Sequence, residues 1–229
     1  MMNKIHAIAI DGPVAAGKGT IATLLSLKLH GFNLNTGAMY RCVALYCIQH
    51  DIPMQKAEKV IQALPDISID LDDEKVFLNG EDVTEQVKKR EVSQSSAKVA
   101  AIAQVRLAMV TRQQEIGLAK MEKGQIVIAE GRDAATKIFP EAMLKIFLTA
   151  RPEVRAKRRY EQMGGRANHT ITFEQILADT NERDRRDYER KADPLVKEPE
   201  KYGYFVLDNS DMTEEQTVEA VLTQWQKLL

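Results

Sequence analysis

The sequence has little cysteine, and this shortage limits the class of protein. Cys42 and Cys47 are the only cysteines among 229 residues. They lie five residues apart on a predicted helix, so their side chains point in different directions and cannot easily form a disulfide. Two cysteines without nearby histidines also make no structural zinc site. We therefore expect two buried free thiols, which fit a protein of the reducing cytoplasm.

An excess of one charge and long apolar runs are also lacking. The 32 Lys and Arg residues nearly balance the 33 Asp and Glu residues, and aromatic residues make up only 6%. This balance argues against a protein that binds nucleic acid or a membrane surface, and no aromatic platform is interleaved with basic residues. Apolar runs reach only the length of a strand, so we expect neither a membrane span nor a signal peptide.

The chain does contain a glycine-rich loop between a predicted strand, residues 5–11, and a predicted helix, residues 18–29. The loop consists of Gly12, Pro13, Val14, Ala15, Ala16, Gly17, Lys18, Gly19 and Thr20. In this order of elements such a loop typically binds phosphate, because glycines let the backbone approach a polyanion and the first helical amides point at it. We expect it to bind ATP, with Lys18 on the β- and γ-phosphates.

Magnesium would accompany a nucleotide bound to this loop. A Ser or Thr usually follows the lysine of such loops and serves the metal. Here Gly19 occupies that place and Thr20 comes one residue later. We expect the hydroxyl of Thr20 to bind Mg²⁺, either directly or through water.

Strands and helices alternate along most of the chain. This order predicts an α/β fold with a doubly wound, mainly parallel sheet and helices on both faces. The expected strands are 5–11, 32–35, 125–129, 144–149 and 204–208, and the expected helices are 18–29, 36–48, 55–64, 104–121 and 213–228. At this length we expect one domain.

A short antiparallel sheet interrupts this pattern. Residues 67–71 alternate apolar and polar side chains as a half-buried strand does, and residues 75–78 form a second apolar run. Asn79-Gly80 follows, which is a strong signal for a hairpin turn. We expect helical structure to resume from about Thr84.

Charged side chains follow several of the predicted strands. Asp11 ends the first strand, the segment Glu130-Gly131-Arg132-Asp133 follows another, and Arg151 follows a third. Ligands of parallel α/β sheets bind outside the carboxyl ends of the strands. We therefore expect these residues to lie around the glycine-rich loop, although a polar turn is the simpler interpretation of 130–133.

Arginines concentrate between residues 151 and 190, which are predicted to be mostly helical. They form two groups, Arg151, Arg155, Arg158, Arg159 and Arg166, and then Arg183, Arg185, Arg186 and Arg190. Ion pairs along a solvated helix explain some of them, since Glu182–Arg186 and Arg185–Glu189 have four-residue spacing. Adjacent arginines lie on different helix faces, so at least one of each pair remains available to bind phosphate, as in a closing lid.

Taken together, these segments resemble the bacterial cytidylate kinases, a family of nucleoside monophosphate kinases with a phosphate-binding loop. The resemblance covers essentially the whole chain. It depends on residues 17–20, 36–41, 78–84, 99–106, 131–133 with 139–140, 182–190 and 192–195. It implies transfer of the γ-phosphoryl group of ATP to CMP, and to dCMP. Separately from the resemblance, we expect a monomer in the cytoplasm.

The resemblance also implies a division of this single domain, 1–229, into three regions. Residues 1–35, 104–150 and 192–229 would form the core. Residues 36–103, with the small sheet, would bind the acceptor nucleotide. Residues 151–191 would form the lid and its adjoining helices.

Matching positions imply a role for individual side chains. Arg41, Arg132 and Arg190 would bind the acceptor phosphate, and Arg158 would lie over the transferring phosphate. Arg106 and Asp133 would bind the cytosine base. The remaining acceptor residues are Thr36, Gly37, Tyr40, Arg183 and Asp187, of which Arg183 and Asp187 would hold the sugar.

The mechanism implied needs no general base, because a phosphate oxygen is already anionic at neutral pH. None of the four histidines lies in a motif, and we expect each to be structural or on the surface. Catalysis would consist of positioning and charge neutralisation by Lys18, Arg132, Arg158, Arg190 and Mg²⁺.

Two other functions remain open from the residues alone. A kinase for another nucleoside monophosphate or for a hydroxylated metabolite is one. A hydroxyl acceptor would need a base, which Asp11 or Asp133 could supply. A nucleotide-dependent switch is the other, although the Asn-Lys-x-Asp motif that reads guanine is lacking.

Overall fold

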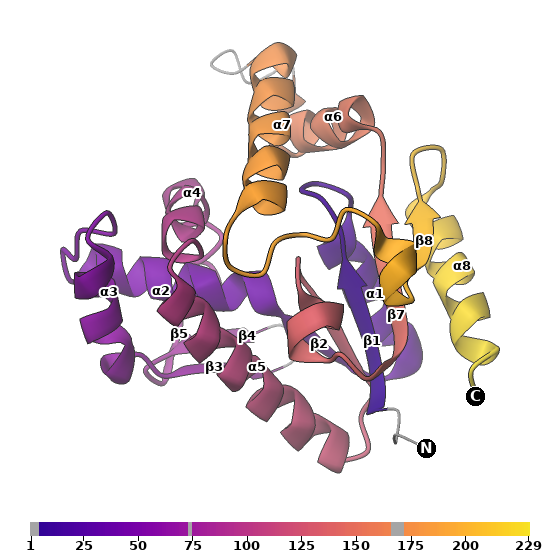
Figure 1. Ribbon diagram of the computed structural model, residues 1–229, viewed down its shortest axis with the longest axis horizontal. Helices are drawn as coiled ribbons and strands as arrows, with labels where there is room; N and C mark the ends of the chain where they lie inside the picture. Colours follow the sequence, from indigo (N-terminus) through magenta and orange to yellow (C-terminus); the bar gives the residue numbers. More distant parts are fainter. Residues whose placement is uncertain (1–4, 73–74, 166–171) are drawn as a thin grey trace.

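The computed structural model describes residues 5–72, 75–165 and 172–229, and Figure 1 shows how their helices and strands are arranged. Within these ranges five strands form a parallel sheet in the order β2-β6-β1-β7-β8. The strands are β1 (Ile5–Asp11), β2 (Phe32–Asn35), β6 (Val127–Glu130), β7 (Ala142–Thr149) and β8 (Phe205–Asp208). This confirms the predicted parallel sheet.

Helices cover both faces of the sheet because side chains alternate along its central strand. Ala7 and Ala9 of β1 belong to the apolar core shared with α2 (Thr36–Gln49) and α5 (Ala103–Glu122). Ile8 and Ile10 belong to a second core, which contains side chains of α1 (Lys18–Leu29) and α8 (Glu214–Gln226). The doubly wound arrangement expected from the sequence is therefore confirmed.

The predicted insert is present between the second and fifth helices. Among the described residues, β3 (Ile69–Asp72), β4 (Lys75–Leu78) and β5 (Glu81–Asp82) form an antiparallel sheet. Its turn has φ of 51° at Asn79 and 83° at Gly80, which an Asn-Gly pair adopts readily.

Two helices flank this insert, α3 (Ala57–Ala63) and α4 (Arg90–Val99). The α4 helix begins later than the predicted Thr84. The reason is that Thr84 belongs to the insert, where its hydroxyl accepts from the Val76 amide at 3.0 Å and donates to the Asp82 carboxylate at 2.6 Å. A hydroxyl engaged in a hairpin in this way competes with helix formation.

The arginine-rich region forms a helical pair, α6 (Pro152–Gln162) and α7 (Phe173–Glu189). Figure 1 shows this pair above the carboxyl end of the sheet, over the loop that follows β1. Arg166 lies outside the described residues. The remaining elements are the 3₁₀ turns η1 (Leu64–Asp66) and η4 (Pro199–Tyr202) and the π-helical turn η2 (Ala134–Ile138).

Candidate active site

The glycine-rich loop is shaped by close contact with the sheet. A Cβ atom on Gly12 would lie 2.0 Å from the carbonyl oxygen of Leu148 in β7, so only glycine fits there. Gly17 has φ of 90° and caps the N-terminus of α1, and Ala15 has φ of 58°. The loop therefore leads its backbone directly into the amide-rich end of a helix, as expected for a phosphate-binding loop.

Lys18 begins α1 and is buried, with 5% of its surface exposed. Its ammonium donates to the carbonyl oxygens of Gly12 at 2.8 Å and Pro13 at 2.6 Å. Burial, and then the positive charge of Arg132, lower the pKa of Lys18 to about 7. The lysine thus lies within the loop that it was predicted to serve, and a bound polyanion would favour its charged form.

This lowered pKa predicts proton uptake when ATP binds. Triphosphate raises the pKa of Lys18 again, so we expect about half a proton to be taken up at pH 7 and more at pH 8. Affinity for ATP should fall as the pH rises above about 7. Calorimetric titration in buffers of different ionisation enthalpy measures the uptake. The Lys18→Ala variant is the control, because any proton uptake that it shows comes from ATP or from other groups. If this variant takes up as many protons as the unmodified protein, the assignment to Lys18 is contradicted.

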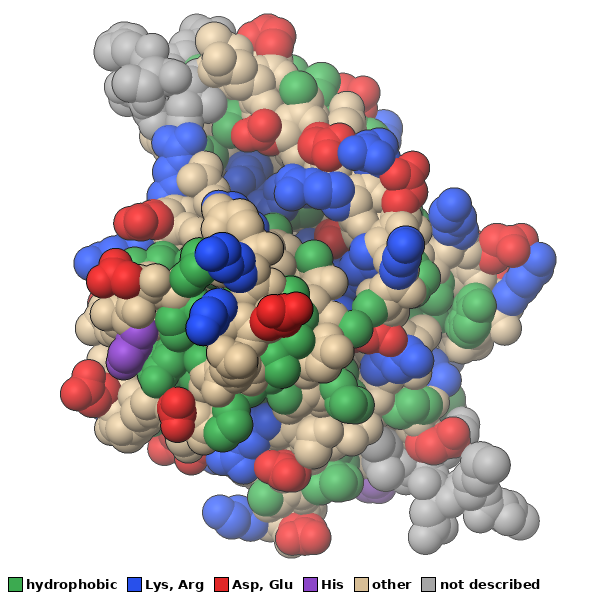
Figure 2. All heavy atoms as spheres, turned by 60° about the vertical axis from the view of Figure 1, so that its left-hand side comes forward, with side chains coloured by type: hydrophobic (Ala, Val, Ile, Leu, Met, Phe, Trp, Pro, Cys, Tyr) green, Lys and Arg blue, Asp and Glu red, His purple; other side chains and the backbone are tan. Residues whose placement is uncertain are grey.

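One cavity of about 880 Å³ joins the loop to the arginines of the sheet edge and of α7. In Figure 2, Lys and Arg side chains gather in and around the recess below the upper lobe of the molecule. Most residues predicted to bind substrate line the cavity, namely Val14, Ala15, Gly17, Lys18, Gly19, Thr20, Thr36, Gly37, Tyr40, Arg41, Arg106, Arg132, Asp133, Arg158, Arg183, Asp187 and Arg190. Gly12, Pro13 and Ala16 are buried behind this lining.

Arg132 and Arg190 lie on either side of Asp187. Arg132 Nε donates to the Asp187 carboxylate at 2.6 Å, and Arg190 Nη1 lies 3.8 Å from its other oxygen. Burial acts to raise the pKa of Asp187, but Arg132, together with Arg190 and Lys18, holds the pKa below its ordinary value. Arg190 Nη2 and Arg41 Nε are buried without a hydrogen-bond partner among the described residues. These cations therefore retain donors for an anion.

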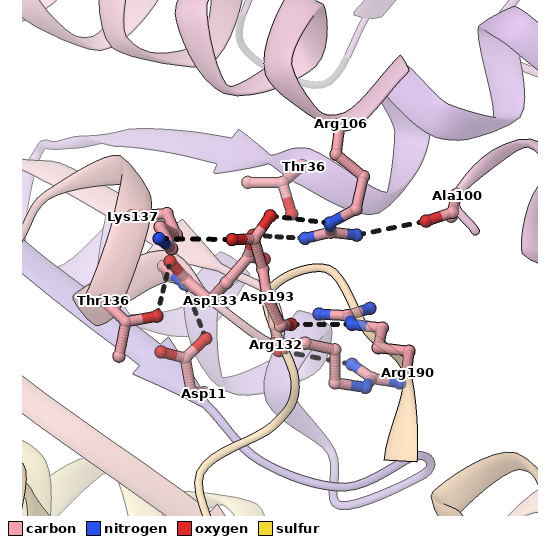
Figure 3. A network of polar contacts seen from close by, with 12 residues as sticks. Asp11, Thr36, Ala100, Arg106, Arg132, Asp133, Thr136, Lys137, Arg190 and Asp193 are labelled. Atoms are coloured by element: carbon pink, nitrogen blue, oxygen red, sulfur yellow. Dashed lines mark hydrogen bonds and ion pairs between the residues drawn. The ribbon is translucent and has the colours of Figure 1, made fainter. Parts of the chain in front are cut away.

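Arg106 is held by two carboxylates, although only 2% of its surface is exposed. It donates to Asp133 through Nη2 and to Asp193 through Nε, the latter at 2.9 Å. Figure 3 shows this network, in which the backbone carbonyl of Asp193 also accepts from Arg190 Nε at 2.6 Å. The guanidinium carbon of Arg106 lies over the ring of Tyr40, 5.5 Å from the centroid of that ring. Arg106 and Asp133 thus form one rigid, charged pair at the cavity wall.

Asp11, at the end of β1, is fully buried and satisfied within the protein. It accepts from the amides of Ala134 and Ala135 at 2.7 and 2.9 Å, and from the hydroxyl of Tyr204 at 2.7 Å. Burial raises its pKa to about 6. Asp11 therefore fixes η2 against β1, and neither it nor Asp133 presents an unengaged carboxylate base.

Arg158 and Arg183 both line the cavity and have different neighbours. Arg158 donates to the side chain of Asn209 at 3.0 Å and to its backbone carbonyl at 2.8 Å. Asn209 in turn donates to the loop carbonyl of Ala16 at 3.2 Å. Burial, then the charges of Arg159 and Arg132, lower the pKa of Arg183 to about 10. An arginine held among like charges is a favourable place for a phosphate.

Several other arginines of this region form ion pairs. Arg151 pairs with Asp211 at 2.6 Å, Arg155 with Asp184 at 2.6 Å, and Arg185 with Glu189 at 2.6 Å. Arg185 and Arg186 both lie beside Glu182. The expected ion pairs along a solvated helix are therefore present for Arg185 and Arg186. Arg151 and Arg155 instead pair with residues of other segments, and the Arg155 pair is buried. Of the adjacent pair Arg158 and Arg159, the second has a buried Nε with no partner in the described part of the chain.

Three residues of this site were not given a role by the sequence analysis. Asp193 holds Arg106, Asn209 holds Arg158, and Asp184 holds the amide of Val14 at 3.0 Å. Asn209 could have been found, since it directly follows β8 at the carboxyl end of the sheet. Asp184 lies 170 residues from Val14, and local sequence patterns carry no signal for such a pair.

The two cysteines of the chain do not form a disulfide. Cys42 and Cys47 are buried and free, and burial raises the pKa of Cys42 to about 12. No cluster of three His, Cys, Asp or Glu side chains that could hold a metal occurs in the ranges described. None of the helices in those ranges is long and apolar enough to cross a membrane. His169 lies outside the described residues.

The fold and the cavity together define the class, a kinase with a phosphate-binding loop, and comparison with known proteins identifies the family. Residues 8–227 match the family model described as Cytidylate kinase. The cytidylate kinase of Caldanaerobacter subterraneus subsp. tengcongensis is 40% identical over 222 residues, which span 96% of this chain and 95% of that protein. The cytidylate kinase of Neisseria meningitidis serogroup A is 37% identical over 227 residues, which span 99% of this chain and 100% of that protein.

Among solved structures, TT1252 from Thermus thermophilus matches 95% of this chain and 96% of its own, with 20% identity and a TM-score of 0.47. The family match and the curated relatives agree. The chain belongs to the cytidylate kinase family, and it is a nucleoside monophosphate kinase that uses ATP as phosphoryl donor.

Proposed function

We propose that this kinase phosphorylates CMP, and also dCMP, giving ADP and CDP or dCDP. One observation carries the proposal: the phosphate-binding loop with Lys18 and the cations Arg41, Arg132 and Arg190 line the same cavity. Two polyanions that meet there repel each other, and guanidinium groups offset this repulsion while holding phosphate oxygens in a defined geometry.

Cytosine would be recognised by the Arg106–Asp133 pair. A carboxylate oxygen can accept from the N4 amine of cytosine, whereas uracil presents a carbonyl at that position. Arg106 can donate to the ring nitrogen and to the carbonyl oxygen. Burial and the contacts with Asp193 and Tyr40 support this assignment, since a rigid pair discriminates better than a mobile one.

The other contacts follow from the same arrangement. Residues 36–103 would form the acceptor subdomain and residues 151–191 the lid. Arg183 and Asp187 would hold the sugar from α7, and Arg158 would approach the donor from α6. Thr36 and Gly37, at the N-terminus of α2, would complete the acceptor site.

Phosphoryl transfer here would depend on positioning and charge. The acceptor oxygen is already anionic, and both Asp11 and Asp133 are engaged by other groups, which disfavours a hydroxyl acceptor that needs a base. Lys18, Arg132, Arg158 and Arg190 would neutralise the phosphoryl group as it transfers. The exposed hydroxyl of Thr20 lies at the cavity and suits Mg²⁺, which prefers oxygen ligands and would add positive charge between the phosphates.

A panel of acceptors tests this function. ADP release should be measured with ATP and CMP, dCMP, UMP, AMP or shikimate, and without any acceptor. We expect CMP and dCMP to be the preferred substrates, and ATP alone to be hydrolysed slowly because the anion that completes the site is lacking. A preference for another acceptor would refute the proposal, and nucleotide turnover without acceptor at a comparable rate would favour a switch.

A further inference from the structure

A buried ion pair between α6 and α7, the two helices of the proposed lid, binds the backbone of Val14 in the phosphate-binding loop. Asp184 of α7 accepts from the Val14 amide at 3.0 Å, and Arg155 of α6 donates to the Val14 carbonyl at 2.9 Å. The two side chains are joined to each other at 2.6 Å, and Arg155 Nε donates to the carbonyl of Ala150 at 2.8 Å. Both hydrogen-bonding groups of one loop residue are thus bound by residues of the lid.

Neither member of this pair can touch a substrate directly. Arg155 is 4% exposed and Asp184 is 9% exposed, and neither lines the cavity. Stability alone does not account for the pair, because apolar side chains in place of a buried ion pair are often equally stabilising. Its effect is geometric, since it fixes the distance between the lid helices and the loop.

The same turn of α7 also carries acceptor-site residues. Arg183 precedes Asp184 and Asp187 follows it by three positions, and both line the cavity. Asp187 is joined there to Arg132. Within one turn, a rigid helix therefore contacts the proposed acceptor site on one side and the donor loop on the other.

We propose that Arg155 and Asp184 are positioning residues that couple acceptor binding to the donor loop, an inference that rests on the proposed function. An acceptor nucleotide bound to Arg183 and Asp187 fixes α7, and α7 fixes Val14 through Asp184. The loop then binds ATP without the entropic cost of ordering itself, so each nucleotide strengthens the binding of the other.

Binding of a non-hydrolysable ATP analogue, with and without saturating CMP, measures this coupling. We expect CMP to strengthen binding of the analogue to the unmodified protein by about 5- to 150-fold, the usual range for coupled sites. In the double variant R155M/D184L, which leaves no buried charge unpaired, the effect should fall below about twofold. CMP alone should bind that variant nearly as it binds the unmodified protein, because neither residue lines the cavity.

The double variant R151M/D211N is the matched control. It removes an ion pair from the N-terminus of α6 that is exposed and does not contact the loop, so coupling should be unchanged. Retention of full coupling by R155M/D184L would overturn the proposal. So would a lack of coupling in the unmodified protein that phosphorylates CMP normally, whereas failure to phosphorylate CMP would overturn the proposed function and the coupling with it.

Hydrogen exchange at the Val14 amide tests the same inference without any substitution, should the double variant fail to fold. That amide donates to Asp184, so CMP alone, in the absence of a donor nucleotide, should slow its exchange. An unchanged rate with CMP bound would overturn the proposal.

Discussion

Replacement of Lys18 by Ala should lower kcat by about 30- to 900-fold, which corresponds to about 2–4 kcal/mol of transition-state stabilisation. The lysine lies buried at the base of the phosphate-binding loop, within reach of two loop carbonyls, where an ammonium acts in a water-poor environment. In the proposed mechanism its loss removes a cation that would neutralise the transferring group, so the effect should fall on kcat more than on the KM for CMP.

Lys28→Ala provides the matched control for this experiment, because Lys28 lies in the last turn of the same helix and is exposed. That variant should retain full activity. Melting temperatures of both variants should be recorded, so that loss of fold is distinguished from loss of catalysis. Near-normal turnover by a folded Lys18→Ala protein would show that the lysine does not have the assigned role.

Replacement of Arg132 by Met should lower kcat/KM for CMP by about 100- to 1000-fold, the range for loss of one preorganised donor. Arg132 lowers the pKa of the loop lysine and donates to the carboxylate of Asp187, which we propose as part of the acceptor site. We expect the KM for CMP to rise and kcat to fall together, while ATP alone binds with little change. Steady-state kinetics with each substrate varied in turn measure both effects.

An independent consequence concerns Lys18 in the same variant. Removing the guanidinium charge of Arg132 should raise the pKa of Lys18, so less proton uptake should accompany ATP binding near pH 7. The control Arg151→Met removes an arginine from an exposed ion pair. It should change neither the KM for CMP nor the proton uptake that accompanies ATP binding. An Arg132→Met protein with an unchanged KM for CMP would exclude Arg132 from the acceptor site.

The elements of the fold could be predicted because their signals are local. The strand, glycine-rich loop and helix over residues 5–29 follow each other in the chain, and Asn79-Gly80 specifies its own turn. The start of α4 was predicted too early because the hydroxyl of Thr84 bonds to Val76 and Asp82 in the hairpin. That preference depends on a tertiary contact and is not visible in helical periodicity.

The site was predictable only in part, because local sequence signals do not report contacts between distant segments. The loop and Arg132 lie at strand ends, and the topology of a parallel sheet brings strand ends together. The partners of the arginines depend on the relative placement of α6 and α7. Arg155 therefore looked like a possible phosphate ligand in the sequence, whereas its guanidinium is buried against Asp184 and Val14.

The most direct test of the account is a crystal structure with CMP and a non-hydrolysable ATP analogue bound together. We expect the phosphate of CMP against Arg41, Arg132 and Arg190, and the triphosphate over the loop with its terminal phosphates beside Lys18. A CMP phosphate lodged away from those three arginines, or a triphosphate that does not reach Lys18, would contradict it.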